Sequence, residues 1–282
     1  MTASHPAASP AERKQEQLAA LLDSLGSVLV AFSGGVDSTY LLWAARQALG
    51  PQRVVALTAT SPTYPTHEFA ESRRLADAIG VRQLVMESNE LEIPGFADNP
   101  PRRCYHCKHE LFSLCVARAG ELGLAAVLDG ANRDDLADYR PGHEAARELG
   151  IRSPLIEVGL GKDEIRALSR AAHLPTAAKQ PFACLASRFP YGTRITAERL
   201  NQVDRCETFL RERGFGTFRV RFHGETARIE VAVSEMSRLL DPALRHDLVA
   251  TCRAAGFTYV ALDLEGYRTG SMNAGIAVPP VP

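Results

Sequence analysis

A glycine turn between an apolar run and a helical pattern constrains the fold of this chain more than any other stretch. Residues 28–32 are all apolar, which is typical of a buried parallel strand, and the turn SGGVDS follows at residues 33–38. Residues 39–49 then have the pattern of a helix. Such a turn directs backbone N–H groups towards a ligand at the positive end of a helix, so the sequence predicts a cradle for phosphate.

Four residues of this turn are suited to phosphate. Gly34 and Gly35 let the backbone approach the oxygens closely, while Ser33 and Ser38 add hydroxyl donors. An ordinary strand-to-helix turn is the alternative interpretation, because glycine and serine are common in such turns. The string is neither a Walker A loop, which needs a Lys-Ser/Thr pair after its last glycine, nor the dinucleotide motif G-x-G-x-x-G.

The first part of the chain alternates short apolar runs with helical patterns, which predicts an α/β fold. Alternation at this spacing gives a parallel sheet with helices on both faces, and ligands of such sheets bind at the carboxyl ends of the strands. The predicted strands cover residues 28–32, 53–58, 81–86 and 125–129, and the predicted helices cover residues 12–25, 39–49, 66–79, 105–122 and 162–172.

Two further loops are expected at the same sheet edge as the glycine turn. The loop that begins at Ala59 follows the second predicted strand and offers backbone groups to an adenine ring. The loop GANRDD at residues 130–135 follows the fourth strand and carries Asp134 and Asp135. These carboxylates predict either a Mg²⁺ site or a solvated turn with a helix cap, and the sequence alone does not separate the two.

The rest of the chain predicts a small α+β domain after an irregular stretch at residues 175–192. Its expected elements are helices at residues 196–213 and 234–254, strands at residues 218–222 and 227–233, and a last strand at residues 259–264. The predicted division is a disordered tail at residues 1–11, a large α/β domain at residues 12–192, a small α+β domain at residues 193–268, and a tail at residues 269–282.

The charge and composition exclude several classes of protein. A net charge of −1 argues against a large electrostatic footprint for nucleic acid, so we expect no nucleic-acid partner. No apolar run approaches the ~20 residues that span a bilayer, and residues 1–12 lack the apolar core of a signal peptide. We therefore expect a cytoplasmic protein without a membrane partner.

The six cysteines do not suggest a secreted disulfide scaffold in a chain of 282 residues. Cys104 and Cys107 form a C-x-x-C pair, and Cys184 lies in the irregular stretch. The other three, Cys115, Cys206 and Cys252, fall on apolar faces of helical patterns and are expected to be core thiols.

Five motifs in order give the chain a resemblance to a known family. The turn SGGVDS is similar to the pyrophosphate loop of the ATP pyrophosphatase (PP-loop) superfamily. Together with the other four motifs it resembles the LarE family, sulfur transferases of nickel-pincer nucleotide synthesis. Those motifs are RCYHCKHELF at residues 103–112, GANRDD at residues 130–135, CLASRFPYGTRIT at residues 184–196, and the paired strings RVRFHG and ARIEV within residues 219–231.

The resemblance implies a defined reaction. ATP adenylates a carboxylate of pyridinium-3,5-biscarboxylic acid mononucleotide and pyrophosphate leaves; sulfur then displaces AMP and forms a thiocarboxylate, which later binds nickel in the cofactor of lactate racemase. A carboxylate is a poor acyl donor until its oxygen becomes part of a leaving group, and the cradle with Mg²⁺ stabilises the charge that moves onto pyrophosphate. The resemblance also implies a homo-oligomer, a hexamer.

The resemblance assigns roles to individual residues as well. Asp37 is expected to organise Mg²⁺ or the turn, and Glu207 and Glu230 are candidate cation ligands by resemblance only. The implied ATP-binding residues are Ala31, Ser33, Gly34, Gly35, Asp37, Ser38, Thr58, Gly130, Asn132 and Asp135, and the arginines expected to hold the substrate phosphate are Arg188, Arg194, Arg219 and Arg221.

Cys184 occupies the family's sulfur-donor position, and two versions of the chemistry are implied. In one, Cys184 gives up its own sulfur and becomes dehydroalanine. In the other, Cys104, Cys107 and Cys184 hold three irons of a 4Fe-4S cluster, and the fourth iron carries sulfide from an external source. Arg188 and Arg194 are placed by sequence to lower the pKa of the Cys184 thiol.

Two alternatives to this function stay open at this point. A tRNA thiolase of the PP-loop superfamily also combines SGGxDS with a C-x-x-C pair and a later cysteine. A non-catalytic ATP-binding regulator with a structural metal at Cys104 and Cys107 is the second, although four zinc ligands at the usual spacing are not present in the sequence. The residues His106, His109 and His223 are commoner as surface or hydrogen-bonded histidines than as metal ligands.

Overall fold

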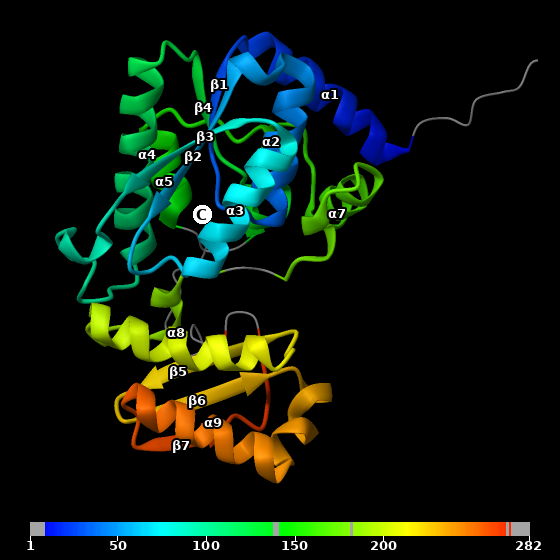
Figure 1. The fold of residues 1–282 in the computed structure, drawn as a ribbon. Coiled ribbons are helices and arrows are strands. Elements are labelled where there is room, and N and C mark those ends of the chain that lie inside the picture. The colour runs from blue at the N-terminus through cyan, green and yellow to red at the C-terminus, as the bar shows by residue number, and fades with distance from the viewer. Residues whose placement is uncertain (1–8, 138–140, 181–182, 269–270, 272–282) are drawn as a thin grey trace, which may run out of the picture. The chain divides into compact units, whose positions relative to one another are not determined.

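The computed structural model describes residues 9–137, 141–180, 183–268 and 271, and its chain divides into two compact units. The first unit comprises residues 1–60, 66–88 and 104–181, and the second comprises residues 61–65, 89–103 and 182–282 (Figure 1). The second unit thus includes two short segments from the first half of the chain. The predicted terminal tails lie largely outside the described residues, and the predicted boundary between folding domains at residue 192 stays a prediction.

The first unit is built on a four-stranded sheet in which all pairs are parallel. The strands are β1 (Val28–Ala31), β2 (Val54–Thr60), β3 (Arg82–Glu87) and β4 (Ala126–Leu128), in the order β3-β2-β1-β4. Because every strand runs the same way, the loops after β1, β2 and β4 emerge at one edge. The predicted α/β class with a parallel sheet is confirmed, and the glycine turn follows its central strand β1.

Helices cover both faces of this sheet, as the alternation along β1 requires. Val28 and Val30 pack into one apolar cluster with Leu18 and Leu41, whereas Leu29 packs into a second cluster on the other face. The helices of the first cluster are α1 (Pro10–Leu25), α2 (Val36–Leu49), α3 (Thr66–Ile79) and α7 (Lys162–Ala171), and those of the second are α4 (Arg103–Glu121) and α5 (Pro141–Glu148) (Figure 1).

Local signals explain where the helices begin. Ser9 and Glu12 form a capping box at the start of α1, with Pro10 in its first turn, so this helix begins two residues before the predicted start. Helix α2 begins at Val36, three residues earlier than predicted, because the extended Gly35 serves as its N-cap. The cradle therefore includes the first turn of the helix itself.

The second unit carries a three-stranded sheet with two helices. The strands β5 (Phe218–His223) and β6 (Thr226–Val231) lie close to the predicted ranges and form an antiparallel hairpin, and β7 (Tyr259–Leu262) pairs with β6 in parallel. Its helices are α8 (Ala197–Glu212) and α9 (Pro242–Ala255).

The prediction of one helix over residues 234–254 is wrong. A 3₁₀ segment, Val233–Leu240, precedes α9, and Asp241 separates the two helical segments. The Asp241 carboxylate accepts a hydrogen bond of 2.9 Å from the N–H of Leu244, and Pro242 occupies the first turn of the new helix. Proline lacks an N–H group for the preceding turn, so it starts a helix more readily than it continues one.

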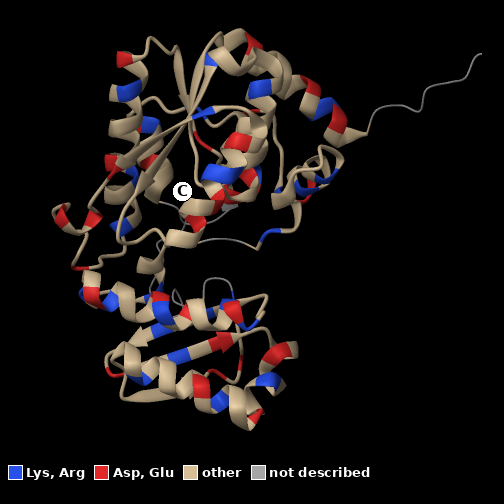
Figure 2. Cartoon of the chain, viewed as in Figure 1, with Lys and Arg blue, Asp and Glu red and all other residues tan. Residues whose placement is uncertain are grey.

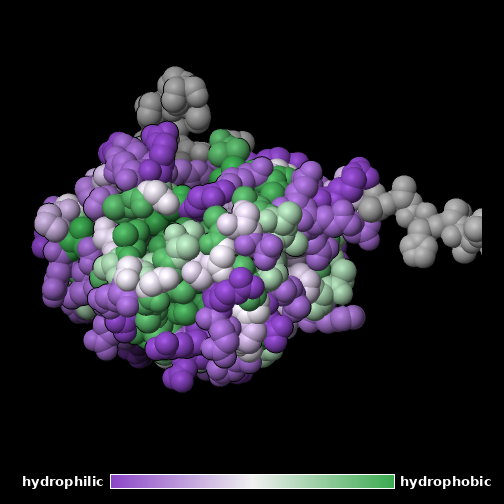
Figure 3. All heavy atoms as spheres, turned by 90° about the horizontal axis from the view of Figure 1, so that it is seen from above, coloured by the Kyte–Doolittle hydropathy of each residue, from purple (hydrophilic) through white to green (hydrophobic). Residues whose placement is uncertain are grey.

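None of the described helices is long and apolar enough to cross a membrane. Charges of both signs are interspersed along the helices (Figure 2), and apolar and hydrophilic residues share the face drawn in Figure 3.

The remaining described elements are short. They are η1 (Pro51–Arg53), η2 (Glu90–Glu92), η3 (Arg133–Ala137), α6 (Pro154–Glu157), η4 (Pro175–Ala178) and η5 (Leu185–Arg188).

Candidate functional site

The turn after β1 has a backbone shape that depends on glycine. Gly34 has φ +68°, and a Cβ atom at this position would lie 3.1 Å from Cβ of Ser72. Gly35 caps α2 without any side-chain hydrogen bond to the first turn of the helix. Because glycine has no side chain, the N-cap residue leaves the N–H groups at the start of α2 available. An anion-binding helix start requires such N–H groups.

Two serines and a neighbouring loop complete the cradle. Oγ of Ser33 lies 3.1 Å from Oγ of Ser38, and Ser38 also donates to the carbonyl oxygen of Gly35 over 3.3 Å. The loop after β4 packs directly on this turn, because a Cβ atom on Gly130 would lie 2.9 Å from the backbone nitrogen of Ser38. A side chain at residue 130 would push the cradle out of shape.

Asp37 lies in the first turn of α2 with only one of its carboxylate oxygens in use. Oδ2 accepts a hydrogen bond from Nζ of Lys162, whereas the buried Oδ1 has no hydrogen-bond partner among the described residues. Burial raises the pKa of Asp37, the charge of Lys162 opposes this, and the nearby carboxylate of Asp135 raises the pKa further. A half-buried carboxylate with one unsatisfied oxygen, beside a second carboxylate, suits a cation.

The donors around Asp37 fit magnesium bound together with phosphate. Within the residues that the structure describes, no group of three or more His, Cys, Asp and Glu side chains could hold a metal by itself. Mg²⁺ is usually held by one or two carboxylates, with water and substrate phosphates as its other ligands. Asp37 and Asp135 match that requirement, and Oδ1 of Asp37 has no partner among the described residues.

The sequence analysis missed two lysines at the cradle. Lys162 begins α7 and bonds Asp37 across 125 residues of sequence. Lys179 bonds the carbonyl oxygen of Gly34 over 3.1 Å and the carboxylates of Glu68 and Glu71 over 2.6 and 2.8 Å. No local pattern marks either lysine; the only signal for Lys162 is its place directly after a glycine at a helix start.

Several predicted ATP-binding residues lie at the same edge and also hold its loops in shape. Thr58 is buried and donates to the carbonyl oxygen of Phe32 over 2.7 Å. Asn132 accepts from the N–H of Asp134, and Asp135 accepts from the N–H of Asn132. Of the two interpretations of this loop, Asp134 follows the turn-and-cap one, since its carboxylate accepts a 2.7 Å hydrogen bond from the N–H of Lys162.

The second unit places Cys184 beside a buried ion pair. The Arg188 guanidinium donates to both carboxylate oxygens of Glu207 over 2.8 Å each, and the two side chains are 3% and 4% exposed. Arg188 also donates to the carbonyl oxygen of Cys184 over 3.2 Å. Burial lowers the pKa of Arg188, but Glu207 and then Cys184 outweigh it and leave the pKa raised. A Cys184 thiolate would thus lie near a fixed positive charge.

The other predicted phosphate-binding arginines have protein partners in the described structure. Arg221 bonds the buried carboxylate of Glu230 over 2.8 and 3.0 Å, so both candidate cation ligands, Glu207 and Glu230, are paired with arginine. Arg194 is exposed and bonds Asp98. Arg219 lies over the ring of Tyr267, 5.1 Å from its centroid. A role for these arginines in substrate binding stays a prediction.

The cysteines divide between the two units. Cys104 is exposed and Cys107 half-buried, three residues apart in the first turns of α4 in the first unit, while Cys184 belongs to the second unit. None of the six cysteines, all of which are described, forms a disulfide, and the three expected core thiols, Cys115, Cys206 and Cys252, are buried. The three-cysteine cluster stays a prediction.

Comparison with known proteins decides the family. The model of the NAD synthase family matches residues 18–95, the part that contains β1, the cradle and α2. The chain is 42% identical over 262 residues to an uncharacterized protein of Synechocystis, covering 93% of this chain and 97% of that protein. It is 39% identical over 261 residues to the pyridinium-3,5-bisthiocarboxylic acid mononucleotide synthase of Lactiplantibacillus plantarum, covering 92% of this chain and 94% of the synthase. The chain belongs to the LarE family.

Membership in the LarE family confirms the resemblance seen in the motifs. The matches extend far beyond the nucleotide cradle, because an uncharacterized protein of Methanocaldococcus jannaschii is also 27% identical over 243 residues, or 86% of this chain. A haloarchaeal argininosuccinate synthase, from Haloarcula marismortui, is 35% identical to this chain over 65 residues, or 23% of this chain. The likeness to LarE therefore includes both units, whereas the NAD synthase model matches only the part that contains the cradle.

Proposed function

We propose that this LarE-family chain is an ATP-dependent sulfur transferase. It adenylates a carboxylate of pyridinium-3,5-biscarboxylic acid mononucleotide and converts the carboxylate into a thiocarboxylate. The synthase of Lactiplantibacillus plantarum, which is similar to this chain along 92% of its length, is named for the synthesis of a bisthiocarboxylic acid mononucleotide. The observation that carries the proposal is the cradle at the start of α2, where a buried oxygen of Asp37 lacks a partner among the described residues.

The residues of the cradle have distinct tasks in this proposal. The N–H groups at the start of α2 and the hydroxyls of Ser33 and Ser38 bind the phosphates of ATP. Asp37 and Asp135 would hold Mg²⁺, which would supply positive charge beside the phosphates. Lys162 keeps Asp37 paired before ATP binds, and its ammonium then turns to the phosphate oxygens.

Adenylation converts the carboxylate into a reactive acyl group. A carboxylate oxygen attacks the α-phosphorus of ATP, the bond to the bridging oxygen breaks, and pyrophosphate leaves with the electron pair. Attack by sulfur at the acyl carbon then expels AMP. Charge develops on phosphate oxygens in the first step, so fixed N–H donors and cations at the cradle lower its barrier.

Cys184 delivers the sulfur in this proposal. Its thiolate attacks the acyl adenylate, and the Arg188 guanidinium lies near it to stabilise the negative charge. In the sacrificial version, loss of the Cα proton and cleavage of the Cβ–S bond release the thiocarboxylate and leave dehydroalanine. Arg194, Arg219 and Arg221 are proposed to hold the nucleotide phosphate.

The cluster version uses the same cysteine differently. We propose as its ligands Cys104, Cys107 and Cys184, whose thiolates are the donors that iron–sulfur clusters require. The group would supply sulfide, so the Cys184 side chain would remain intact. Anaerobic reconstitution should then give about four irons per chain, with loss of the brown absorbance in Cys104→Ser. Dehydroalanine at residue 184 after turnover of reconstituted protein would instead establish the sacrificial version.

Incubation of the full chain with ATP, Mg²⁺ and the pyridinium dicarboxylate nucleotide tests the reaction. Mass spectrometry should detect the thiocarboxylate product, with or without a loss of sulfur from Cys184. In Cys184→Ala, pyrophosphate release should persist while thiocarboxylate formation ceases. Loss of both activities in a folded Cys184→Ala protein would make Cys184 a structural residue and contradict the proposal. A homo-oligomer and a cytoplasmic location are part of the proposal, and light scattering and cell fractionation test them.

A further inference from the structure

A pocket of about 360 Å³ lies in the first unit, at the other end of α2 from the cradle. It is lined from Trp43 to Gln47 on α2, whereas the cradle lies at the start of the same helix. Nine residues separate Asp37 from Arg46, which is about 13 Å of helix. The volume lies in the lower part of the range of small-molecule sites, which is about 300–1,000 Å³. The proposed sulfur transfer does not use this pocket.

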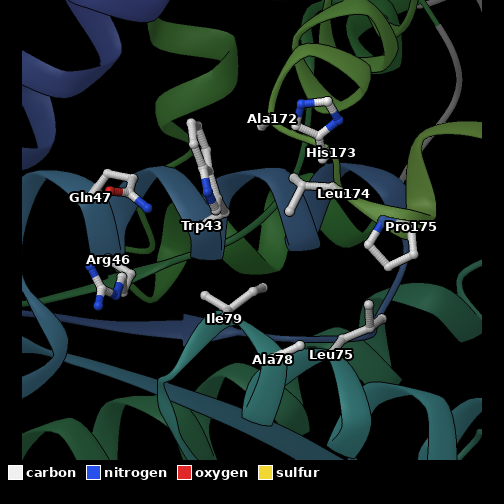
Figure 4. Close-up of a pocket in the computed structure, with 10 residues that line it drawn as sticks. All are labelled: Trp43, Arg46, Gln47, Leu75, Ala78, Ile79, Ala172, His173, Leu174 and Pro175. Atoms are coloured by element: carbon white, nitrogen blue, oxygen red, sulfur yellow. The ribbon is translucent and has the colours of Figure 1, made fainter.

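Three elements of the first unit form the walls (Figure 4). Helix α2 contributes Trp43, Arg46 and Gln47, whose spacing of three and four residues places them on one helix face. Helix α3 contributes apolar residues at the same spacing, including Leu75 and Ile79, and the segment at residues 172–175 forms the third wall. The pocket is thus lined by apolar side chains from all three elements and by polar ones, among them the cationic Arg46 of α2.

Arg46 lines the pocket without using its guanidinium. Its Nε is buried, and among the described residues its side chain has neither a hydrogen-bond acceptor nor an ion-pair partner. Two carbonyl groups in the last turn of α2 have other donors, because Gly50 N–H donates to the carbonyl of Arg46 and Arg53 Nε donates to that of Leu49. A buried N–H without an acceptor is costly, so Arg46 provides a donor for a ligand.

Charge and shape complementarity together select the ligand. A guanidinium binds a carboxylate through two parallel charge-assisted hydrogen bonds, each about twice as strong as a hydrogen bond between neutral groups. Trp43 is half-buried and stacks on Tyr40 with ring centroids 5.9 Å apart, so it presents a fixed aromatic surface to the pocket. A flat apolar body packs well against such a surface and against Leu75 and Ile79.

The walls of the pocket are also the elements that hold the cradle. Helix α2 begins in the cradle, and α3 carries Glu68 and Glu71, which bind Lys179. The third wall runs into η4 and then to Lys179, which bonds the carbonyl oxygen of Gly34 in the cradle. A ligand that changes the packing among these three elements changes the support of the cradle as well.

We propose that this pocket binds a small planar aromatic carboxylate and that its occupancy changes the affinity of the cradle for ATP. The carboxylate pairs with Arg46, and the ring packs against Trp43 and the apolar wall from α3. Coupling of this kind is reciprocal, so ATP also changes the affinity for the carboxylate.

The binding test uses fluorescence of Trp43, which is the only tryptophan of the chain. Benzoate should change the emission of the full-length protein in a saturable way, and benzamide, with the same ring but no charge, should bind at least about tenfold more weakly. Arg46→Gln should remove this preference for benzoate, whereas Arg74→Gln, which removes an equal charge from an exposed position of α3, should retain it. Circular dichroism checks that both variants are folded.

Three results would overturn the binding site: no saturable response to benzoate, equal binding of benzamide, or an unchanged preference in folded Arg46→Gln. Arg46→Lys gives a second check, because it keeps the charge but loses the paired hydrogen bonds, and its affinity should fall between those of the parent and Arg46→Gln. This fluorescence readout involves no sulfur chemistry, so its failure is distinct from failure of the proposed function.

The coupling has its own measurement. Calorimetric titration of ATP into the protein at saturating benzoate should give an affinity at least about threefold different from that without benzoate. The same comparison in Arg46→Gln should show no difference. Equal ATP affinities with and without benzoate in the parent protein would overturn the coupling.

Discussion

Two carboxylates, the half-buried Asp37 in the first unit and the buried Glu207 in the second, have pKa values that are displaced in opposite directions. Burial raises the pKa of Asp37, and Lys162 offsets only part of this effect. Burial also tends to raise the pKa of Glu207, but the attraction and hydrogen bonds of Arg188 outweigh it, so the pKa is lowered. The difference lies in how completely each carboxylate is satisfied by the protein.

The hydrogen bonds account for this contrast. Both oxygens of Glu207 are occupied, one by Arg188 and by the N–H of Val220, the other by Arg188 again. Asp37 retains a buried oxygen without a partner among the described residues. A fully satisfied pair is a structural device, whereas an incompletely satisfied carboxylate at a helix start is prepared for a ligand.

The largest expected effect is on stability in the second unit. Glu207→Gln leaves Arg188 buried without its counter-charge and should lower the free energy of unfolding by about 3–5 kcal/mol. Urea unfolding of the full chain, followed by circular dichroism, measures the loss. The exposed Glu212 at the end of the same helix is the matched control, and Glu212→Gln should stay within about 0.5 kcal/mol of the parent. Equal effects of the two substitutions would show that the pair is not structural.

A smaller effect is expected at the contact between Gly130 and the cradle. In Gly130→Ala the new Cβ atom would lie 2.9 Å from backbone of Ser38, so the start of α2 must shift. We expect a loss of about 1–3 kcal/mol in stability, accompanied by weaker ATP binding in calorimetry. Gly120→Ala is the control, because nothing lies within 4 Å of its Cβ position in α4. Unchanged ATP affinity in Gly130→Ala would show that the loop at residue 130 does not support the ATP-binding shape of the cradle.

The smallest effect on stability is expected at Asp37, and its sign differs from that at Glu207. Because its pKa in the folded protein lies above the ordinary 3.8, the folded state binds the proton more tightly than the unfolded state. This group therefore subtracts stability as the pH rises from 3.8 through the raised pKa, and Asp37→Asn should be at least as stable as the parent at neutral pH.

The pH dependence of unfolding tests this sign. The stability of Asp37→Asn relative to the parent should increase with pH across that window and then level off. Glu207 behaves in the opposite way: its contribution is complete above 4.5 and is lost as the pH falls through its lowered pKa. A destabilisation of Asp37→Asn comparable to that of Glu207→Gln would mean that Asp37 is structural after all.

Sequence patterns predicted the parts of the molecule that depend on local periodicity. The helix at residues 66–79 and the alternation around the parallel sheet have strong periodic signals, and the cradle follows directly from SGGVDS. The contacts of Lys162 and Lys179 with the cradle connect residues 125 and 145 positions apart, and no spacing rule reports such contacts. The helix predicted over residues 234–254 failed because its periodicity continues through a break that Pro242 imposes.

The ion pairs of the second unit were hard to predict because they too join residues that are distant in the sequence. An arginine in a sequence looks equally suited to a substrate phosphate and to a carboxylate of the protein, and the pairing of Arg188 with Glu207 appears only when η5 and α8 are folded. The pocket beside Trp43 was also not predicted, since its walls come from three separate parts of the sequence.

Exchange of radiolabelled pyrophosphate into ATP, in the presence of the pyridinium dicarboxylate nucleotide, tests the central claim most directly. It reports reversible adenylation at the cradle and does not depend on the source of sulfur. The account predicts nucleotide-dependent exchange in the parent protein and in Cys184→Ala, and a loss of about 100-fold or more in Asp37→Asn. Absence of nucleotide-dependent exchange in the parent, or exchange at the parent's rate in Asp37→Asn, would contradict the account.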